Sequence, residues 1–308
     1  MRDRKTHHKN RTKLNALRVF ISLSVALAAS CVRTATVDQT ALPPPLLVSG
    51  SERVSFKSSL LNKEMGMYVH LPPGYNPARE YPTVYLLHGY GNNEVEWFDY
   101  YGMDDVSDRL VSDGTIPPMI LVAVRMDNSW GVDTGKPRQL SAKASTSLYK
   151  GPYESYLLRE VIPLVEERYS VRRDTDSRCI AGVSMGGYAA LHIGLRNTRI
   201  FGSIAAHSPA LRGPKVPEWF LYSKTRPAAR NDPILLAGEL RQGRTRLWLD
   251  CGESDGLLPG VVEMRDTLVA NGWEIEYSIT TGAHDARYWT SRLADYLVFY
   301  AGATSRFR

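Results

Sequence analysis

Short runs of apolar residues alternate with amphipathic stretches along the chain from residue 51 onward. Some runs are almost continuously apolar, as at residues 84–87 and 120–124, which is typical of strands in a sheet covered on both faces. Such strands, alternating with helical periodicity, favour an α/β fold with a mostly parallel central sheet of about eight strands and helices on both faces. We predict strands at residues 54–58, 67–71, 83–88, 119–124, 179–183, 203–206, 246–251 and 274–279. We predict helices at residues 103–112, 154–169, 186–195, 232–240, 261–271 and 286–299.

A single catalytic domain is predicted at residues 51–304, because this region shows neither an internal repeat nor a second apolar core. The first two predicted strands are joined by a short loop, so we expect an antiparallel hairpin at the edge of the sheet. Residues 127–150 and 211–231 lack clear periodicity. Loops of this length inside a domain are usually functional or mobile.

Residues 1–30 have the form of a secretory signal peptide, with a basic segment, a short apolar run and small residues. The apolar run is shorter than the ~20 residues that span a bilayer; a frayed helix of a cytosolic protein is the alternative. Cys31 follows three small residues, which resembles a bacterial lipobox and implies cleavage before Cys31 and a lipid on its thiol. Plain cleavage after Ala28 or Ser30 stays open. Residues 31–50 contain three consecutive prolines and predict a semi-rigid tether.

This segment predicts an exported protein, located in the bacterial periplasm, at the outer membrane as a lipoprotein, or outside the cell. Membrane contact is expected only through the N-terminal lipid. Residues 1–30 hold seven of the 38 basic residues and one of the 32 acidic ones, so they account for the net charge of +6. The rest of the chain is neutral, and we expect no nucleic-acid partner.

The composition is that of a globular protein, with 43% hydrophobic and 23% charged residues. It excludes wholesale disorder and fibrous classes. Three cysteines cannot build a disulfide framework. Cys179 and Cys251 lie in apolar, strand-like runs, so we expect two buried free thiols. The sequence has no metal-ligand spacing and no cofactor motif, so we expect neither a metal nor a cofactor.

The pattern Gly-x-Ser-x-Gly occurs twice, around Ser184 and around Ser254. The pattern is typical of a tight turn from a strand into a helix, which holds a nucleophilic serine clear of the sheet. Ser184 follows a predicted strand and precedes a helix, whereas Ser254 is followed by a loop. The usual order of serine, acid and histidine also favours Ser184, because both partners can follow it along the chain.

His284 is the expected general base, because it lies in a loop after a strand, at the edge where ligands bind in open α/β sheets. His192 lies on the helix after Ser184 and is expected to be structural. The base needs an acceptor for its other N–H. Asp255 follows the carboxyl end of a strand and is the expected acceptor. The alternatives are Asp250, Glu253 and Asp266.

A tetrahedral intermediate needs two backbone donors for its oxyanion. One is expected to be the N–H of Met185, the residue after the nucleophile. The other is expected in the glycine-containing loop at residues 88–93, after the third strand. Tyr90 is the preferred donor there, and Gly91 is the alternative.

These motifs together resemble the putative esterase family of α/β-hydrolases, which contains esterase D, feruloyl esterases, enterochelin esterases and the mycolyltransferase antigens. The matching stretches lie in order at residues 85–89, 114–120, 153–163, 182–187, 250–255 and 282–289. The resemblance implies the α/β-hydrolase fold, a triad of Ser184, Asp255 and His284, and the oxyanion donors Tyr90 and Met185. The chain departs from the family at Ser208-Pro209, where Ser-Gly is usual, and in the Pro- and Arg-rich residues 212–231.

The sequence therefore predicts a secreted serine carboxylesterase that forms an acyl-enzyme and acts on a small-molecule or glycan-linked ester. An acyltransferase with the same triad is one alternative. A non-catalytic binding module on the same fold is another, because a fold does not determine function. Trp130, His207 and Trp289 are candidates for contacting the substrate, although large aromatic side chains more often pack in the core.

Overall fold

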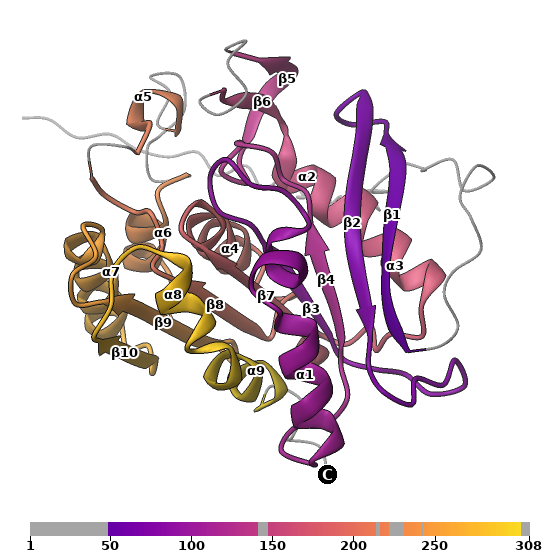
Figure 1. The fold of residues 1–308 in the computed structure, drawn as a ribbon. Helices are drawn as coiled ribbons and strands as arrows, with labels where there is room; N and C mark the ends of the chain where they lie inside the picture. Colours follow the sequence, from indigo (N-terminus) through magenta and orange to yellow (C-terminus); the bar gives the residue numbers. More distant parts are fainter. Residues whose placement is uncertain (1–48, 141–146, 214–215, 222–230, 242, 303–308) are drawn as a thin grey trace, which may run out of the picture. The chain divides into compact units, whose positions relative to one another are not determined.

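An eight-stranded sheet has the order β1-β2-β4-β3-β7-β8-β9-β10 in the computed structural model, which describes residues 49–140, 147–213, 216–221, 231–241 and 243–302 (Figure 1). The strands are β1 (Gly50–Ser58), β2 (Lys63–Leu71), β3 (Thr83–Leu87), β4 (Ile120–Val124), β7 (Arg178–Val183), β8 (Ser203–His207), β9 (Arg246–Gly252) and β10 (Glu276–Thr280). Strand β2 is antiparallel to β1 and β4, and all other neighbours are parallel. The predicted strands and the edge hairpin are confirmed.

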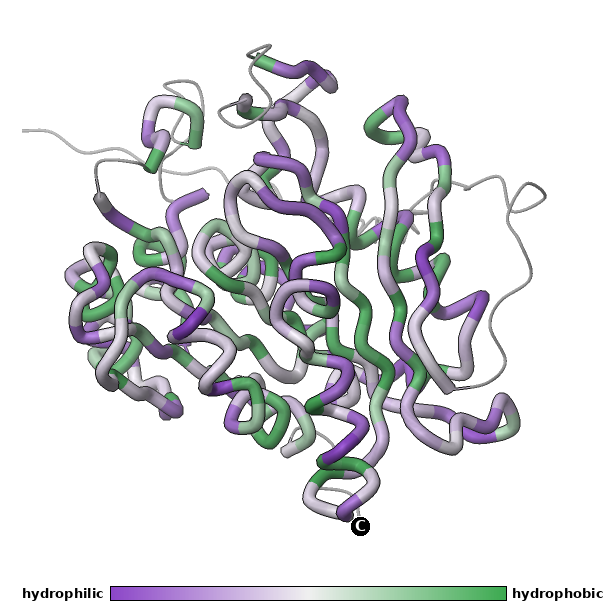
Figure 2. The backbone as a smooth tube through the Cα atoms, viewed as in Figure 1, coloured by the Kyte–Doolittle hydropathy of each residue, from purple (hydrophilic) through white to green (hydrophobic). Residues whose placement is uncertain are grey.

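Helices cover both faces of this sheet, as the sequence predicted. They are α1 (Met103–Ser112), α2 (Tyr153–Tyr156), α3 (Ile162–Arg168), α4 (Met185–Arg196), α5 (Glu218–Leu221), α6 (Pro233–Glu239), α7 (Leu258–Ala270), α8 (Ala286–Thr290) and α9 (Leu293–Gly302). Successive strand side chains point to opposite faces. In β3, Tyr85 and Leu87 pack in the core with α3, α4, α6 and α7, whereas Val84 and Leu86 pack with α1 and α9. Figure 2 shows that hydrophobic positions run along the central strands.

Two of the predicted helices are interrupted. The helix predicted at residues 154–169 contains a π-helical turn, η3 (Leu157–Val161), between α2 and α3. The helix predicted at residues 286–299 is divided into α8 and α9, which are separated by Ser291 and Arg292. The apolar period continues across both interruptions, so hydrophobic spacing alone could not locate them.

The aperiodic residues 127–150 contain a second, two-stranded antiparallel sheet of β5 (Asp133–Gln139) and β6 (Tyr149–Pro152). Strand β5 is mostly exposed, so it lacks the apolar alternation by which strands are recognised. A further short element, the π-helical η2 (Glu96–Tyr100), lies between β3 and α1. Of residues 211–231, the structure describes α5 and a few flanking residues.

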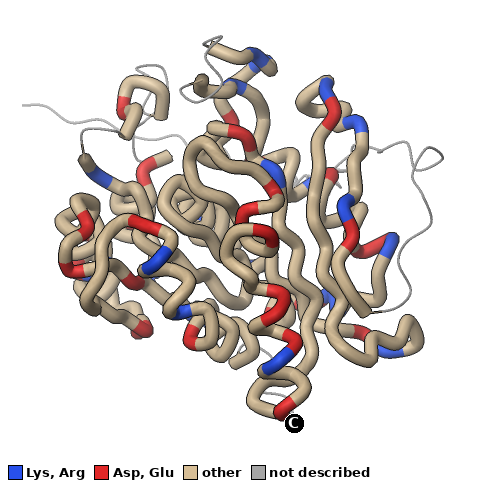
Figure 3. Tube along the Cα trace, in the orientation of Figure 1, with Lys and Arg blue, Asp and Glu red and all other residues tan. Residues whose placement is uncertain are grey.

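The predictions for the N-terminal segment lie outside the described residues, which begin at residue 49. This applies to the signal peptide at residues 1–30, to Cys31 and to nearly all of the tether at residues 31–50. Within the described part of the chain, no helix has both the length and the hydropathy to cross a bilayer. Cys179 and Cys251 are buried free thiols. Figure 3 shows basic and acidic positions interspersed over the same residues.

A buried carboxylate connects α2 to the end of α4. Glu154 accepts hydrogen bonds from Arg196 Nε, at 3.1 Å, and from Asn197 Nδ2, at 3.0 Å, and it lies 3.4 Å from His192 Nε2. Burial opposes ionisation of Glu154, but His192 and Arg196 outweigh it and lower the pKa of the carboxyl to about 2. The folded state therefore favours the ionised form of Glu154.

We expect Glu154→Gln to lower the free energy of unfolding by on the order of 2–3 kcal/mol at pH 7. A lowered native pKa contributes stability above the unfolded pKa, and this stability is lost as the pH falls from about 4.5 toward 2. The deficit should therefore shrink at pH 3.5, as measured by urea unfolding. Glu167→Gln, at an exposed position of α3, is the control. An equal deficit at both pH values would assign the effect to packing.

Candidate active site

Ser184 lies in a sharp turn between β7 and α4, with φ of 55° and ψ of −114°. The flanking glycines make this turn possible. A Cβ on Gly182 would lie 2.3 Å from the carbonyl of Gly186, and a Cβ on Gly186 would lie 2.2 Å from the carbonyl oxygen of Leu87. The strand, the turn and the neighbouring β3 are thus too close together for any side chain at these two positions.

The structure brings Ser184, His284 and Asp255 together at the carboxyl ends of the parallel strands. Ser184 Oγ lies 2.8 Å from His284 Nε2, and His284 Nδ1 lies 2.8 Å from Asp255 Oδ2. Ser184 follows β7, Asp255 follows β9, and His284 lies in the loop between β10 and α8. The imidazole of His284 is 33% exposed, whereas the carboxylate of Asp255 is fully buried. Within the pair, solvent therefore reaches the imidazole and not the carboxylate.

Asp255 is held in its ionised form. Burial alone would favour the neutral acid, but hydrogen bonds from His284 and from the Leu257 N–H, at 2.8 Å, lower the pKa of Asp255 below its ordinary value. An ionised carboxylate can only accept, so His284 Nδ1 carries the proton of this hydrogen bond. His284 Nε2 is then left to accept the hydroxyl proton of Ser184.

The alternative nucleophile and the alternative acceptors that the sequence offered lie outside this series of hydrogen bonds. Ser254 is exposed in the turn after β9. Glu253 accepts a hydrogen bond from Thr281 Oγ1, and Asp266 pairs with Arg265 on α7. Asp250 is fully buried and bonds His207. Each of these carboxylates has its own partner, so Asp255 is the one that meets His284.

The backbone N–H groups of Met185 and Tyr90 make no hydrogen bond among the described residues. Met185 is the first residue of α4, and the first N–H groups of a helix have no acceptor inside it. In the loop after β3, the Gly91 N–H donates to Asn128 Oδ1 at 2.7 Å and the Gly89 N–H donates to Glu96 Oε2 at 2.6 Å. The Tyr90 N–H between them makes no hydrogen bond among the described residues. This geometry favours Tyr90 over Gly91 as an oxyanion donor.

The three residues that the sequence suggested for substrate contact are buried, and their contact with a substrate stays a prediction. His207 has no exposed surface, and its Nδ1 and Nε2 bond Asp250 and Tyr300. Trp130 is 3% exposed and packs edge-on against Tyr188. Trp289 is 7% exposed, and its ring lies 5.0 Å from that of His284. Large aromatic side chains stabilise a fold by the area they bury, and these positions follow that rule.

The sequence analysis missed Glu96 and Asn128, whose side chains hold the loop after β3. Glu96 had a signal: it is a charged residue directly before the aromatic pair Trp97-Phe98. A carboxylate that is buried together with large aromatic neighbours requires partners. Asn128 had no such signal, because asparagine is ordinary in a loop. Among the residues that the structure describes, no three His, Cys, Asp or Glu side chains are placed to hold a metal ion.

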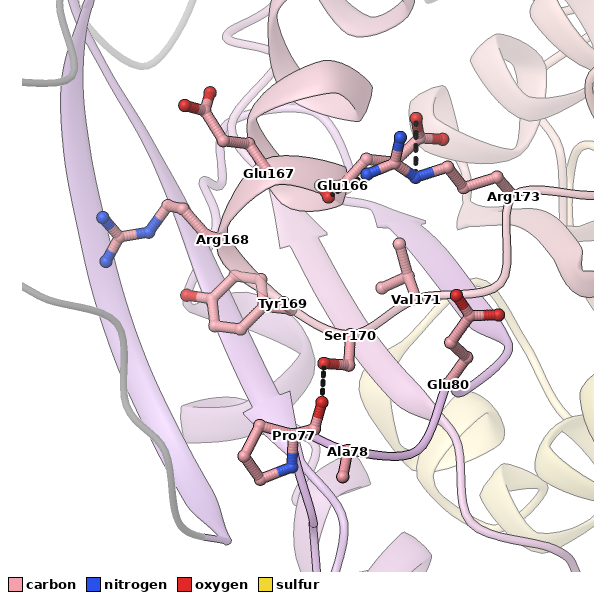
Figure 4. A pocket seen from close by; sticks show the side chains of 10 residues that line it. All are labelled: Pro77, Ala78, Glu80, Glu166, Glu167, Arg168, Tyr169, Ser170, Val171 and Arg173. Carbon is pink, nitrogen blue, oxygen red and sulfur yellow. Dashed lines mark hydrogen bonds and ion pairs between the residues drawn. The ribbon is translucent and has the colours of Figure 1, made fainter.

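A polar pocket of about 410 Å³ lies at the other end of the sheet, between the loops before β3 and after α3 (Figure 4). Its polar groups pair with one another: Ser170 Oγ donates to the carbonyl of Pro77 at 2.6 Å, and Arg173 lies 3.9 Å from Glu166. The pocket lies near the amino ends of β3 and β7, whereas Ser184 follows the carboxyl end of β7. It is therefore separate from the candidate active site.

Known proteins share this architecture. A solved ferulic acid esterase superimposes with a TM-score of 0.71 at 27% identity, covering 84% of this chain and 99% of that chain. The endo-1,4-beta-xylanase/feruloyl esterase of Xylanibacter ruminicola is 31% identical over 157 residues, which are 49% of this chain and 20% of the relative. The acetyl esterase of Caldicellulosiruptor saccharolyticus is 22% identical over 272 residues, 79% of this chain and 95% of the relative. The chain spans between a fifth and a third of the length of this xylanase/feruloyl esterase and of other curated relatives that it matches.

The family comparison covers most of the chain. The family described as "Putative esterase" matches residues 58–300, which contain seven strands of the eight-stranded sheet and only the last residue of β1. The matched region also includes Ser184, Asp255 and His284. The α/β-hydrolase fold that the motifs implied is confirmed. The chain belongs to the putative esterase family.

Proposed function

We propose that the chain is an exported serine carboxylesterase that hydrolyses its substrate through an acyl-enzyme on Ser184. The observation that carries this proposal is the hydrogen-bonded series from Ser184 Oγ through His284 to Asp255, with 2.8 Å at both steps. A serine hydroxyl is a poor nucleophile at neutral pH and needs an adjacent base. That base needs an acceptor that fixes its tautomer and stabilises its cation. In this series Ser184 is the nucleophile, His284 is the base and Asp255 is the acceptor.

The first half of the reaction forms the acyl-enzyme. Ser184 Oγ attacks the ester carbonyl carbon while His284 Nε2 takes the hydroxyl proton. The carbonyl oxygen becomes an oxyanion, which accepts hydrogen bonds from the N–H groups of Tyr90 and Met185. Each donor can lower the barrier by about 3 kcal/mol, because it is oriented before charge develops. The intermediate collapses, the C–O bond to the alcohol breaks, and His284 returns the proton to the leaving oxygen.

The second half releases the acid. Water attacks the acyl carbon while His284 Nε2 takes a proton from it, and the same N–H groups stabilise the second oxyanion. Collapse breaks the bond to Ser184 Oγ, which regains the proton from His284. Asp255 stabilises the imidazolium in both halves, and its lowered pKa keeps it ionised through the cycle.

The substrate class that we propose is an ester of a hydroxycinnamic acid, in which the alcohol part is either a small molecule or a glycan. The support is the similarity to a solved ferulic acid esterase and to the Xylanibacter ruminicola xylanase/feruloyl esterase. A panel of short-chain, long-chain and hydroxycinnamoyl esters tests this assignment. Higher kcat/KM for methyl ferulate than for methyl butyrate, which has the same leaving alcohol, is the expected result, and the reverse order would contradict it.

A fluorophosphonate probe tests the proposed chemistry directly. We expect the folded chain to hydrolyse p-nitrophenyl acetate and the probe to attach with 1:1 stoichiometry, since an activated serine attacks phosphorus as it attacks a carbonyl. Peptide mass spectrometry should place the adduct on Ser184. Ser254, which lies in the same five-residue pattern but is exposed in a turn, serves as the internal control and should stay unmodified. A folded chain that is neither labelled nor active would contradict the proposal.

Export remains part of the proposal and rests on residues 1–30 and Cys31 alone. The basic segment, the apolar run and the small residues before Cys31 support removal of the leader and lipid attachment to the cysteine thiol. Intact-mass analysis of the protein expressed with this leader in a bacterial host is the test. An N-terminus at Cys31 with a lipid adduct is expected; full-length chain in the cytosol would refute export.

A further inference from the structure

Glu96 is a buried carboxylate with no role in the mechanism above. It lies on η2, in the segment between β3 and α1, and is 2% exposed. Its Oε2 accepts the Gly89 N–H at 2.6 Å, and its Oε1 accepts the Tyr101 hydroxyl at 2.9 Å and the side-chain amide of Asn92. A carboxylate is costly to bury without such partners. Two of its partners, Gly89 and Asn92, belong to the loop that carries Tyr90.

Asn128 holds the same loop from the other side. It is 4% exposed, and its Oδ1 accepts the Gly91 N–H at 2.7 Å. The Asn128 side chain is itself fixed, because Nδ2 donates to the carbonyl of Ser147 at 2.9 Å. Its backbone carbonyl also accepts the Tyr149 N–H of β6 at 3.2 Å. The hairpin of β5 and β6 therefore anchors the acceptor that Asn128 presents to the loop.

The two acceptors bracket Tyr90. The N–H groups before and after it each donate to a buried side chain, while its own N–H makes no hydrogen bond among the described residues. The loop has little intrinsic rigidity, because glycines precede and follow Tyr90, and Gly91 has a φ of +87°. Without the two acceptors, these peptide planes could rotate and the direction of the Tyr90 N–H would not be set.

We propose that Glu96 and Asn128 are positioning residues that orient the Tyr90 N–H as an oxyanion donor by holding the N–H groups on either side of it. This inference rests on the proposed esterase function. It follows the general requirement that oxyanion donors be oriented before the reaction, since a donor that must reorient in the transition state stabilises it less.

Glu96 is also connected by packing to the base. The ring of Tyr101, whose hydroxyl bonds Glu96, lies 6.0 Å from that of Trp289. Trp289 in turn packs edge-on against His284, with ring centroids 5.0 Å apart. The loop that carries the oxyanion donor and the loop that carries the base thus share one continuous set of buried contacts.

Steady-state kinetics on p-nitrophenyl acetate, with Asn128→Ala and Glu96→Ala, test the inference. For each variant kcat should fall by roughly 10- to 100-fold, somewhat less than for deletion of an oxyanion donor, because the Tyr90 N–H is misoriented rather than removed. KM should change less than about twofold, since these residues act on the transition state. Affinity for a trifluoromethyl ketone, whose hemiketal oxyanion uses the same donors, should weaken in parallel with kcat/KM.

Conservative variants distinguish a loss of orientation of the Tyr90 N–H from a general loss of structure. Glu96→Gln keeps an oxygen acceptor for the Gly89 N–H, and we expect it to recover most of the lost kcat. Asn128→Asp keeps the acceptor for the Gly91 N–H but loses the Nδ2 donor to Ser147, so we expect it to recover only part of the lost kcat. Asn76→Ala is the matched control, because this exposed side chain accepts the Ala78 N–H in the loop before β3, outside the loop that carries Tyr90, and the change should leave kcat unchanged. Active-site titration with the fluorophosphonate probe corrects every rate for the folded fraction.

The outcomes distinguish this inference from the proposed function. An active wild-type chain labelled at Ser184, with kcat per labelled site unchanged in both alanine variants, would overturn the positioning role alone. A proportional rise in KM with unchanged affinity for the trifluoromethyl ketone would also overturn it. A wild-type chain without turnover or labelling would overturn both the function and the positioning role.

Discussion

Ser184→Ala is expected to lower kcat for p-nitrophenyl acetate by on the order of 10⁴-fold or more. The change removes the one oxygen that His284 Nε2 contacts, so no acyl-enzyme can form. The fold should be unaffected, because the hydroxyl bonds only the exposed edge of His284 and alanine keeps the Cβ of serine. Initial-rate kinetics and circular dichroism measure the two quantities.

Ser254→Ala is the matched control for this experiment. It alters the other Gly-x-Ser-x-Gly match, whose serine is exposed and follows β9 rather than preceding a helix. Its kcat should stay within about twofold of the wild type, as is usual for surface substitutions away from the chemistry. If Ser184→Ala kept native turnover, or if Ser254→Ala lost it, the assignment of the nucleophile would fail.

Asp250→Ala is expected to lower the free energy of unfolding by on the order of 3–5 kcal/mol. The carboxylate has no exposed surface and accepts four hydrogen bonds. The donors are His207 Nδ1 at 2.6 Å, Trp248 Nε1 at 2.8 Å, and the hydroxyls of Tyr288 and Tyr296 at 2.9 Å each. Alanine would leave these groups without an acceptor in the interior, and such unsatisfied groups are expensive.

Urea unfolding monitored by tryptophan fluorescence measures the free energy of unfolding of Asp250→Ala and of the wild type. Asp266→Ala on α7 is the control: Asp266 is 62% exposed and, among the described residues, pairs with Arg265, so its loss should lower the free energy of unfolding by less than about 1 kcal/mol. Similar midpoints for the two variants would show that the Asp250 cluster contributes little. Tyr288, which donates to Asp250, lies four residues after His284. If Asp250→Ala disturbs Tyr288, His284 should also be held less firmly, and kcat should fall.

The strands were predictable because their signal is local. In β4, from Ile120 to Val124, every residue is apolar and buried, and such a run has few alternatives to an interior strand. The exposed β5 had no such signal and was missed. The turn at Ser184 was recognisable for a similar reason, because glycines at positions 182 and 186 are required sterically within a few residues of each other.

The sequence by itself determined the core strands, the turn at Ser184 and the set of histidines and carboxylates that could serve it. Only the tertiary structure decided which of them meet: His284 lies 100 residues from Ser184 along the chain, yet 2.8 Å from its hydroxyl. His207, which the sequence suggested for substrate contact, is instead fully buried and hydrogen-bonded to Asp250. Hydrophobic periodicity is set by residues a few positions apart, whereas hydrogen-bond partners at the sheet edge depend on strand order and on the packing of α8 and α9, which no local pattern encodes.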